Sequence, residues 1–258
     1  MTDLDVAQQM ADAARAAILP LFRKGDLATE NKASDGFDPV TRADRAAETA
    51  MREVLARLRP EDGVWGEEFG RADGQSGRLW VLDPIDGTRG FIAGTPTWGV
   101  LIALTENGAP TMGIIDQPYI GERFIGAPGR AHMMGPLGES DLGVSTTKKL
   151  SDAVIFTTFP EVGTESEGQA FHRVAQQCRL TRYGMDCYAY ALLAAGHVDL
   201  VIEAGLSAYD ILAPIAVIEA AGGLVTNWDG GSVHAGGRVL AAATPELHAR
   251  ALELLGSK

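Results

Sequence analysis

The segment WVLDPIDGTR, residues 80–89, constrains the chemistry and the fold of this chain most strongly. A short apolar strand ends in one carboxylate, Asp83, and a second, Asp86, follows three residues later, before a Gly-Thr pair that can begin a helix. Two acids this close at the end of a buried strand are costly to bury without a partner. A divalent cation would offset their repulsion, and the backbone N–H groups of Gly87 and Thr88 would offer an anion site. The alternative is that Asp-Pro and Asp-Gly only form turns.

Further acidic groups along the chain admit either a structural or a catalytic interpretation. An acidic pair ends the segment Gly66–Glu68, and Asp210 opens an apolar, helix-like segment, where Asp is a favoured N-cap. Asp38 precedes a Pro-Val turn, and Thr41 with Asp44 has the spacing of a capping box. Each group alone is explained by a turn or a cap. Their occurrence together with the acids at the strand end favours a metal site.

The charge balance and the cysteine content exclude several classes of protein. The 258 residues carry a formal net charge of −12, which argues against broad contact with nucleic acid or anionic lipid. No apolar run reaches the roughly 20 residues that cross a bilayer, and the acidic N-terminus lacks the features of a secretory signal. The two cysteines form no disulfide framework and the five histidines no zinc cluster. We therefore expect a cytoplasmic protein and a hard cation such as magnesium or manganese.

Hydrophobic spacing predicts the elements of the first half. Helices are expected at residues 3–23 and from Thr41 to Pro60, each opened by a capping box. Strands are expected at residues 79–83, 97–104, 111–116 and 122–127, the last two forming a hairpin. Residues 25–40 predict a loop or a short hairpin. Residues 128–150 are rich in Gly, Ser and Thr, so we place a domain boundary there, between residues 1–140 and 141–258.

Strands and helices alternate in the second half. Strands are expected at residues 153–158, 198–203, 224–228 and 239–243. Helices are expected at residues 165–178, 186–195, 210–221 and 245–255. This alternation is typical of an α/β layered domain.

Taken together, the acidic motifs resemble the inositol monophosphatase superfamily of magnesium-dependent, lithium-sensitive phosphomonoesterases. The matching elements are DPVTRAD at residues 38–44, GEE at 66–68, DPIDGT at 83–88 and YD at 209–210, which runs into EAAGG at 219–223. Many members carry Trp where this chain has Tyr209. The resemblance implies an alternating helix–sheet–helix–sheet–helix sandwich and a homodimer.

The resemblance also implies a ligand set of carboxylates. Glu67, Asp83 and the carbonyl oxygen of Ile85 would hold a first Mg²⁺, and Asp83, Asp86 and Asp210 a second. Glu67 would help to hold a third, weaker ion through water, and Mn²⁺ is an alternative to Mg²⁺. Two or three ions per active site are therefore implied.

The remaining catalytic roles follow from the same resemblance. The phosphate would lie between the metals and the backbone N–H groups of Gly87 and Thr88. Glu67 would provide the route for deprotonating the attacking water. Asp38 with Thr88 would orient that water.

Two acids on the leaving-group side distinguish branches of the superfamily. Asp186 stands where inositol monophosphatases usually carry Ala, and Glu203 would add a second negative charge. Two acids suit a cationic leaving group better than a neutral polyol, because an unpaired acid is costly to desolvate. The chain resembles the histidinol-phosphatase branch over residues 86–94, 186–190 and 203–211. Met185 and Gly90 depart from that branch.

The resemblance thus implies a phosphatase that releases histidinol and phosphate from histidinol phosphate in histidine biosynthesis. An inositol-1-phosphate phosphatase or a broad-specificity phosphomonoesterase is the alternative within enzymes. A regulatory protein that keeps the fold without turnover is the alternative outside them, although all four metal-binding acids are present.

Several residues near the pocket keep a second interpretation. Asp186 would also serve as a helix N-cap, and Arg89 would either bind the substrate or pair with a neighbouring acid. Tyr188 and Tyr190 cannot share one helix face, so at most one lines the pocket. Trp98 and Tyr190 are candidates for an exposed apolar face in a dimer.

Overall fold

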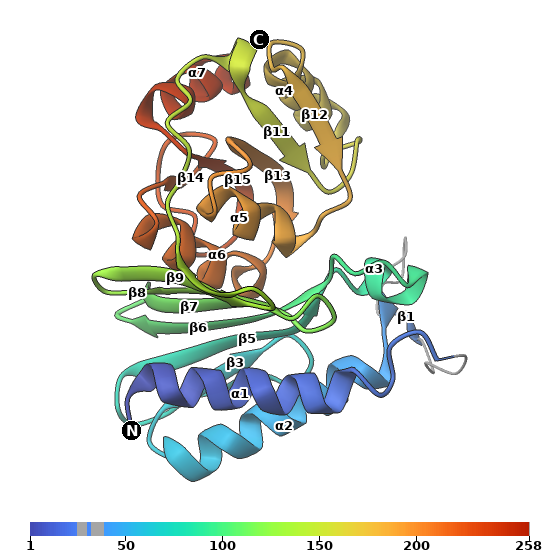
Figure 1. The fold of residues 1–258 in the computed structure, drawn as a ribbon, viewed down its shortest axis with the longest axis vertical. Coiled ribbons are helices and arrows are strands. Elements are labelled where there is room, and N and C mark those ends of the chain that lie inside the picture. Colours follow the sequence, from blue (N-terminus) through green and yellow to red (C-terminus); the bar gives the residue numbers. More distant parts are fainter. Residues whose placement is uncertain (25–29, 32–38, 258) are drawn as a thin grey trace.

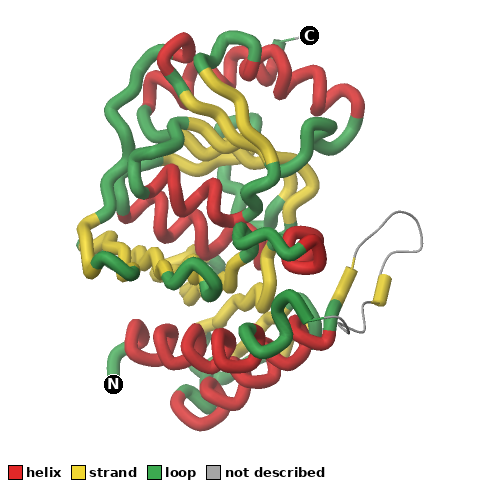
Figure 2. Tube along the Cα trace, turned by 45° about the vertical axis from the view of Figure 1, so that its right-hand side comes forward, coloured by secondary structure: helices red, strands yellow, loops and turns green. Residues whose placement is uncertain are grey.

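The computed structural model describes residues 1–24, 30–31 and 39–257, and it arranges them in five layers (Figure 1). Two N-terminal helices cover the outer face of an eight-stranded sheet. Two further helices lie between this sheet and a five-stranded sheet, whose outer face is covered by another pair (Figure 2). The predicted helix–sheet–helix–sheet–helix sandwich is therefore confirmed.

The outer helices begin where the sequence predicts. They are α1 (Asp3–Ile18) and α2 (Arg42–Leu58). Thr2 with Asp5 and Thr41 with Asp44 form the two capping boxes, so the free N–H groups of both first turns are bonded locally. α1 ends at Ile18 and not at the predicted residue 23, because Pro20 has no backbone N–H with which to continue the helical hydrogen bonds.

The eight-stranded sheet has the strand order β10-β9-β8-β7-β6-β5-β3-β4. Its strands are β3 (Gly63–Gly66), β4 (Gly70–Ala72), β5 (Arg78–Asp86), β6 (Gly99–Glu106), β7 (Ala109–Gln117), β8 (Glu122–Ala127), β9 (Arg130–Gly135) and β10 (Gly138–Asp141). β7 and β8 form the predicted hairpin. A separate pair, β1 (Glu30–Asn31) and β2 (Pro39–Val40), is also antiparallel.

The hairpin of β9 and β10 lies within residues 128–150, where only a domain boundary is predicted above. β10 is exposed along its whole length, and β9 buries only Ala131 and His132. Such strands lack the alternating apolar pattern that reveals a strand in a sequence. The division into residues 1–140 and 141–258 stays a prediction.

The five-stranded sheet has the order β12-β11-β13-β15-β14. Its strands are β11 (Val154–Thr157), β12 (Leu180–Tyr183), β13 (Leu200–Leu206), β14 (Leu224–Asn227) and β15 (Gly237–Ala242). The remaining helices are α3 (Thr88–Ala93), the 3₁₀ turn η1 (Leu150–Asp152), α4 (Glu165–Ala175), α5 (Cys187–Ala194), α6 (Ala208–Ala220) and α7 (Pro245–Gly256). Within the described ranges, we find no helix with the length and apolar character needed to cross a membrane.

α6 lies close to the eight-stranded sheet because two strand residues that face it have no side chain. A Cβ atom at Gly113 of β7 would be 2.5 Å from the carbonyl oxygen of Ala213, and one at Gly126 of β8 would be 2.4 Å from that of Ala216. Neither strand could carry a larger residue there without moving the helix backbone. This close approach brings the first turn of α6, which carries Asp210, to the end of β5.

The two aromatic residues expected on an exposed dimer face are buried instead. Trp98 is 0% exposed and Tyr190 is 2% exposed. The Trp98 ring packs edge-on against Phe22 and Phe91, with centroid separations of 5.1 and 5.0 Å. Aromatic residues contribute to cores as readily as to interfaces, so their presence in the sequence did not distinguish the two.

Replacing Gly113 by Ala tests whether the close contact of α6 with the sheet is required. The added Cβ must displace the α6 backbone, and overpacking of this kind costs about 1–3 kcal/mol. We expect Gly113→Ala to lower the free energy of unfolding by that amount in urea titrations. Gly135→Ala on β9 is the matched control, since its nearest neighbour would be 3.5 Å away. Equal stability of the two variants would show that α6 can shift freely.

Candidate active site

A cavity of about 420 Å³ opens where the two sheets and the central helices meet. The end of β5, the start of α3, the start of α5, the end of β13 and the first turn of α6 all contribute to its wall. Its volume suits a small organic phosphate. Of the residues considered above, it is lined by Glu67, Asp83, Ile85, Asp86, Gly87, Thr88, Arg89, Asp186, Tyr190, Glu203, Tyr209 and Asp210.

Three carboxylates converge at the base of this cavity. Asp83, Asp86 and Asp210 each offer an oxygen atom, and these atoms lie within 4.8 Å of one another. The ladder between β5 and β6 shifts register between Asp83 and Asp86, so both acids can approach the same point. Asp210 lies in the capping box of α6, where it also accepts the Ser207 N–H at 2.7 Å.

Burial and the close approach of these acids raise the pKa values of Asp83 and Asp86. Burial raises the pKa of Asp83 well above its usual range, and the nearby charges of Glu67, Asp86 and Asp210 raise it further. Burial, followed by Asp186 and Asp210, does the same to the pKa of Asp86. A cluster of hard oxygen donors of like charge fits a divalent cation such as Mg²⁺ or Mn²⁺.

Two further predicted ligands border the same cluster. Glu67 lines the cavity, and its backbone N–H donates to the Leu82 carbonyl at 3.2 Å, which ties the turn after β3 to β5. The backbone N–H of Ile85 donates to Asp83 Oδ1 at 3.0 Å, and its carbonyl oxygen accepts from Thr88 Oγ1 at 3.0 Å. The structure therefore brings all five predicted metal-binding residues to one cavity.

Asp44 belongs to the DPVTRAD motif and caps α2 as predicted, and it also contacts the cavity residue Thr88, a contact that was not predicted. Its Oδ2 accepts from the N–H and the hydroxyl of Thr41, whereas its Oδ1 lies 3.3 Å from Thr88 Oγ1. Burial raises the pKa of Asp44 to about 6. Asp38, which we expected beside Thr88, lies outside the described residues. The described carboxylate in contact with Thr88 is thus Asp44.

Asp186 occupies a strained position at the start of α5. Its φ of 48° is unusual for a residue with a side chain, and conformations of this kind cost of order 1–3 kcal/mol. Asp186 stands at the N-cap position of α5, as one interpretation predicted, but its carboxylate makes no capping hydrogen bond. Instead the carboxylate lies against α3, since a Cβ atom at Gly87 would be 2.7 Å from Asp186 Oδ2. Thr97 Oγ1 donates to the same oxygen at 3.4 Å.

Glu203 is the second acid on the leaving-group side. Its Oε1 accepts from both the backbone N–H and the hydroxyl of Thr158, at 3.0 and 2.6 Å. The guanidinium of Arg89 lies 4.9 Å from the centroid of the half-exposed Phe159 ring. Thr158 and Phe159 were not predicted, because the loop after β11 carries no motif, and only the fold brings it to the cavity.

Comparison with known proteins agrees with this geometry. The model of the inositol monophosphatase family matches residues 2–258. The chain belongs to the inositol monophosphatase family. It is 43% identical to the bifunctional phosphatase IMPL2 (chloroplastic) of Arabidopsis thaliana, over 98% of this chain and 76% of that protein. It is 37% identical to the histidinol-phosphatase of Mycobacterium tuberculosis, over 93% of this chain and 92% of that protein.

The fold comparison gives the same family. The structure of an inositol monophosphatase from Zymomonas mobilis superposes with a TM-score of 0.87 at 40% identity, covering 99% of this chain and 98% of the other. This phosphatase therefore shares both the fold and the acidic motifs of its family, as the sequence predicted.

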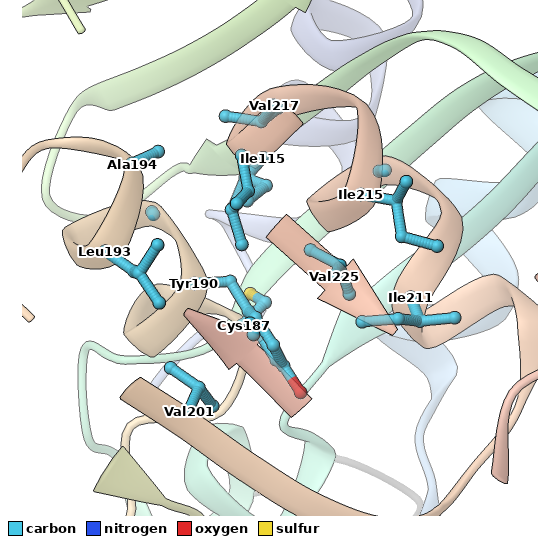
Figure 3. Close-up of a cluster of buried hydrophobic side chains, with 14 of the residues drawn as sticks. Ile115, Cys187, Tyr190, Leu193, Ala194, Val201, Ile211, Ile215, Val217 and Val225 are labelled. Carbon is cyan, nitrogen blue, oxygen red and sulfur yellow. The ribbon is translucent and has the colours of Figure 1, made fainter. Parts of the chain in front are cut away.

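The two tyrosines of α5 lie on different faces of the helix, as their spacing predicts. Tyr188 lies outside the cavity lining and donates its hydroxyl to Glu122 Oε2 at 2.8 Å. Tyr190 lines the cavity, and its ring extends past Cys187, with the hydroxyl oxygen pointing away from Leu193 (Figure 3). Within the described residues the buried Tyr190 hydroxyl has no hydrogen-bond partner. Burial, and then the carboxylate of Glu203, raise the pKa of Tyr190 well above its usual range, so the phenol stays protonated.

The titration of Glu203 predicts how the stability of the metal-free phosphatase depends on pH. Burial, followed by the charges of Asp186 and Asp210, raises the pKa of Glu203 from 4.5 to about 7. The folded state then binds more protons than the unfolded state between these values, so its stability falls as pH rises through them. The difference between the folded-state and unfolded-state pKa of Glu203 corresponds to about 3 kcal/mol of unfolding free energy, because each pKa unit is equivalent to about 1.4 kcal/mol.

We therefore expect Glu203→Gln to raise the melting temperature above that of the wild type at pH 8, in the presence of a chelator. At pH 5, where Glu203 is already protonated, the two proteins should melt at nearly the same temperature. Thermal melts across this range make the comparison. A difference between the two proteins that does not grow with pH would contradict the assignment.

Proposed function

We propose that this phosphatase hydrolyses histidinol phosphate to histidinol and phosphate in histidine biosynthesis, with Mg²⁺ as its natural cofactor and Mn²⁺ as a substitute. One observation carries the proposal: the carboxylates of Asp186 and Glu203 lie on the same cavity as the cluster of Asp83, Asp86 and Asp210. Relatives named histidinol-phosphatase at 37% and 38% identity support it.

The charge of the cavity favours a cationic leaving group. Three divalent cations would balance Glu67, the three clustered aspartates and a phosphate dianion, which leaves the charges of Asp186 and Glu203 to be balanced by the organic half of the substrate. Histidinol carries an ammonium group and a titratable imidazole, whereas inositol is neutral. Arg89 lies close enough to lower the pKa of Asp186, but burial outweighs it, so a cationic ligand still gains from the pair.

The reaction would take place between the acidic cluster and the start of α3. Glu67, Asp83, Asp86, Asp210 and the carbonyl oxygen of Ile85 would hold two or three cations. Bound cations would neutralise charge on the phosphoryl oxygens and lower the pKa of the attacking water. Hydrogen bonds from nearby backbone N–H groups would then orient the phosphate.

Residues of this chain would also bind the phosphate and accept the proton of the attacking water. The backbone N–H groups of Gly87 and Thr88 would receive the phosphate. The Thr88 hydroxyl has one proton, which can go to the Ile85 carbonyl oxygen at 3.0 Å or to Asp44 Oδ1 at 3.3 Å. With that carbonyl oxygen bound to a cation, the proton would be donated to Asp44, and the hydroxyl oxygen would accept a hydrogen bond from the attacking water. Glu67 would provide a second route for the proton, and a contribution of Asp38 stays a prediction. General base assistance of this kind contributes about 10²–10⁴-fold to a rate.

The contact between Thr88 and Asp44 predicts a defect in turnover. Asp44→Asn keeps the cap on α2 but removes the acceptor charge, so we expect kcat to fall at least about 10²-fold with little change in KM. Phosphate release under saturating Mg²⁺ measures both parameters. Asp5→Asn, at the same position in the capping box of α1, is the control and should keep wild-type kinetics. A loss confined to KM would place Asp44 in binding instead.

The substrate proposal is tested by two esters at equal concentration. We expect kcat/KM for histidinol phosphate to exceed that for inositol 1-phosphate by more than about tenfold, or about 1.4 kcal/mol of preference. Asp186→Asn should lower this ratio of kcat/KM values about tenfold relative to the wild type. The substitution removes one charge that would pair with the cationic leaving group.

The alternatives predict different outcomes of the same assay. Similar rates for both esters, unchanged by Asp186→Asn, would indicate an inositol-1-phosphate or broad-specificity phosphatase. No release from either ester in a protein that binds Mg²⁺ would favour a regulatory role. The homodimer and the cytoplasmic location implied by the resemblance stay predictions.

A further inference from the structure

A second carboxylate of α2 lies one helical turn beyond Asp44, at Glu48. Residues four apart project from one face of a helix, and both side chains are 0% exposed. Asp44 reaches Thr88 at the start of α3, as described above. Glu48 reaches the turn after β3, which carries Glu67.

The hydrogen bonds of Glu48 fix the backbone of that turn. Its Oε2 accepts from the N–H of Glu68 at 2.7 Å, and its Oε1 accepts from the N–H of Phe69 at 3.2 Å. Arg52, on the next turn of α2, donates Nε to Glu48 Oε1 at 2.7 Å and a terminal N–H to the carbonyl oxygen of Gly70. The carboxylate therefore bonds both backbone donors that follow Glu67, while Arg52 balances its charge.

Gly66 makes room for this arrangement. A Cβ atom at Gly66 would be 2.0 Å from Glu48 Oε1 and 2.2 Å from its carboxyl carbon. The carboxylate thus occupies the space of a side chain directly before Glu67. The glycine of the GEE motif is required by Glu48 rather than by its own backbone angles, which are not those of a left-handed residue.

We propose that Glu48 is a positioning residue for the metal-binding site: by bonding the two amides that follow Glu67, it holds the Glu67 carboxylate at the cavity. The inference rests on the proposed role of Glu67 as a ligand and not on the identity of the phosphate ester. α2 then acts as a rigid spacer, because one helical turn fixes the distance between the Thr88–Asp44 contact and the Glu67 turn. Groups that orient a metal ligand typically change metal affinity about 10- to 100-fold when they are removed.

Two measurements on the full chain test the proposal. In Glu48→Gln the amide keeps the volume of the carboxylate, but its NH₂ group cannot accept a backbone N–H. We expect the dissociation constant for Mn²⁺, measured by calorimetry without substrate, to rise about 10-fold or more. We also expect the amides of Glu68 and Phe69 to lose protection from hydrogen exchange in the metal-free protein.

Gly66→Ala approaches the same contact from the other side and should reproduce both effects. Asp199→Asn is the matched control, because Asp199 is also a buried carboxylate that accepts a backbone N–H, from Val154 at 2.7 Å, but it lies at the start of β13. It should lower the melting temperature without changing Mn²⁺ affinity. If Glu48→Gln does not fold, Arg52→Gln can be tested in its place. It removes the cation that pairs with Glu48 but leaves the carboxylate, so we expect smaller changes in the same two measurements.

Three outcomes would overturn the proposal. Wild-type Mn²⁺ affinity despite lost amide protection would mean that the turn is not needed for the site. An equal loss of affinity in Asp199→Asn would reduce the effect to general destabilisation. Unchanged amide protection in Glu48→Gln would show that the turn is held by other contacts. A wild-type protein that binds Mn²⁺ but hydrolyses neither ester would instead refute the proposed function and leave this inference standing.

Discussion

The repulsion among three closely spaced carboxylates, of which Asp83 is fully buried, is the interaction on which the rest of this structure depends. Asp83 and Asp86 come from the end of β5, and Asp210 comes from the first turn of α6, more than 120 residues further along the chain. Their oxygens lie within 4.8 Å of one another, and burial strengthens the repulsion. A divalent cation would offset this charge and would link the end of β5 to the first turn of α6.

The surrounding architecture can be understood as a means of holding these acids in place. Gly113 and Gly126 let α6 approach the eight-stranded sheet, so that Asp210 reaches β5. The N–H of Cys187 donates to Asp86 Oδ2 at 2.6 Å, which ties the start of α5 to the same cluster. Because Asp186 directly precedes Cys187, the residue proposed to read the leaving group is fixed by the contact that orients a metal-binding acid. The proposed substrate selection and the proposed cation binding would therefore depend on one segment of backbone.

Local signals in the sequence were sufficient for most elements and for the acidic cluster. Capping boxes predicted the starts of α1 and α2, and the DPIDGT motif identified Asp83 and Asp86, because in both cases the interacting residues are close in the chain. The contact of Asp44 with Thr88 was not predicted because it joins residues 44 positions apart, whereas the capping contact of Asp44 with Thr41 is local. Tyr190 was misplaced on the surface because helix spacing fixes which residues share a face, but not which face is buried. The edge strands β10 and β12 were not predicted because exposed strands lack the alternation of apolar and polar residues.

The most direct test of the account is the position of bound Mn²⁺ in crystals, located by anomalous diffraction. We predict at least two peaks inside the cavity, one in contact with Asp83, Asp86 and Asp210 and another in contact with Glu67 and Asp83. A cavity without peaks at saturating Mn²⁺, or ions bound only elsewhere on the acidic surface, would contradict it. The acids at the end of β5 would then have to be stabilised by some other means, and the proposed chemistry would lose its basis.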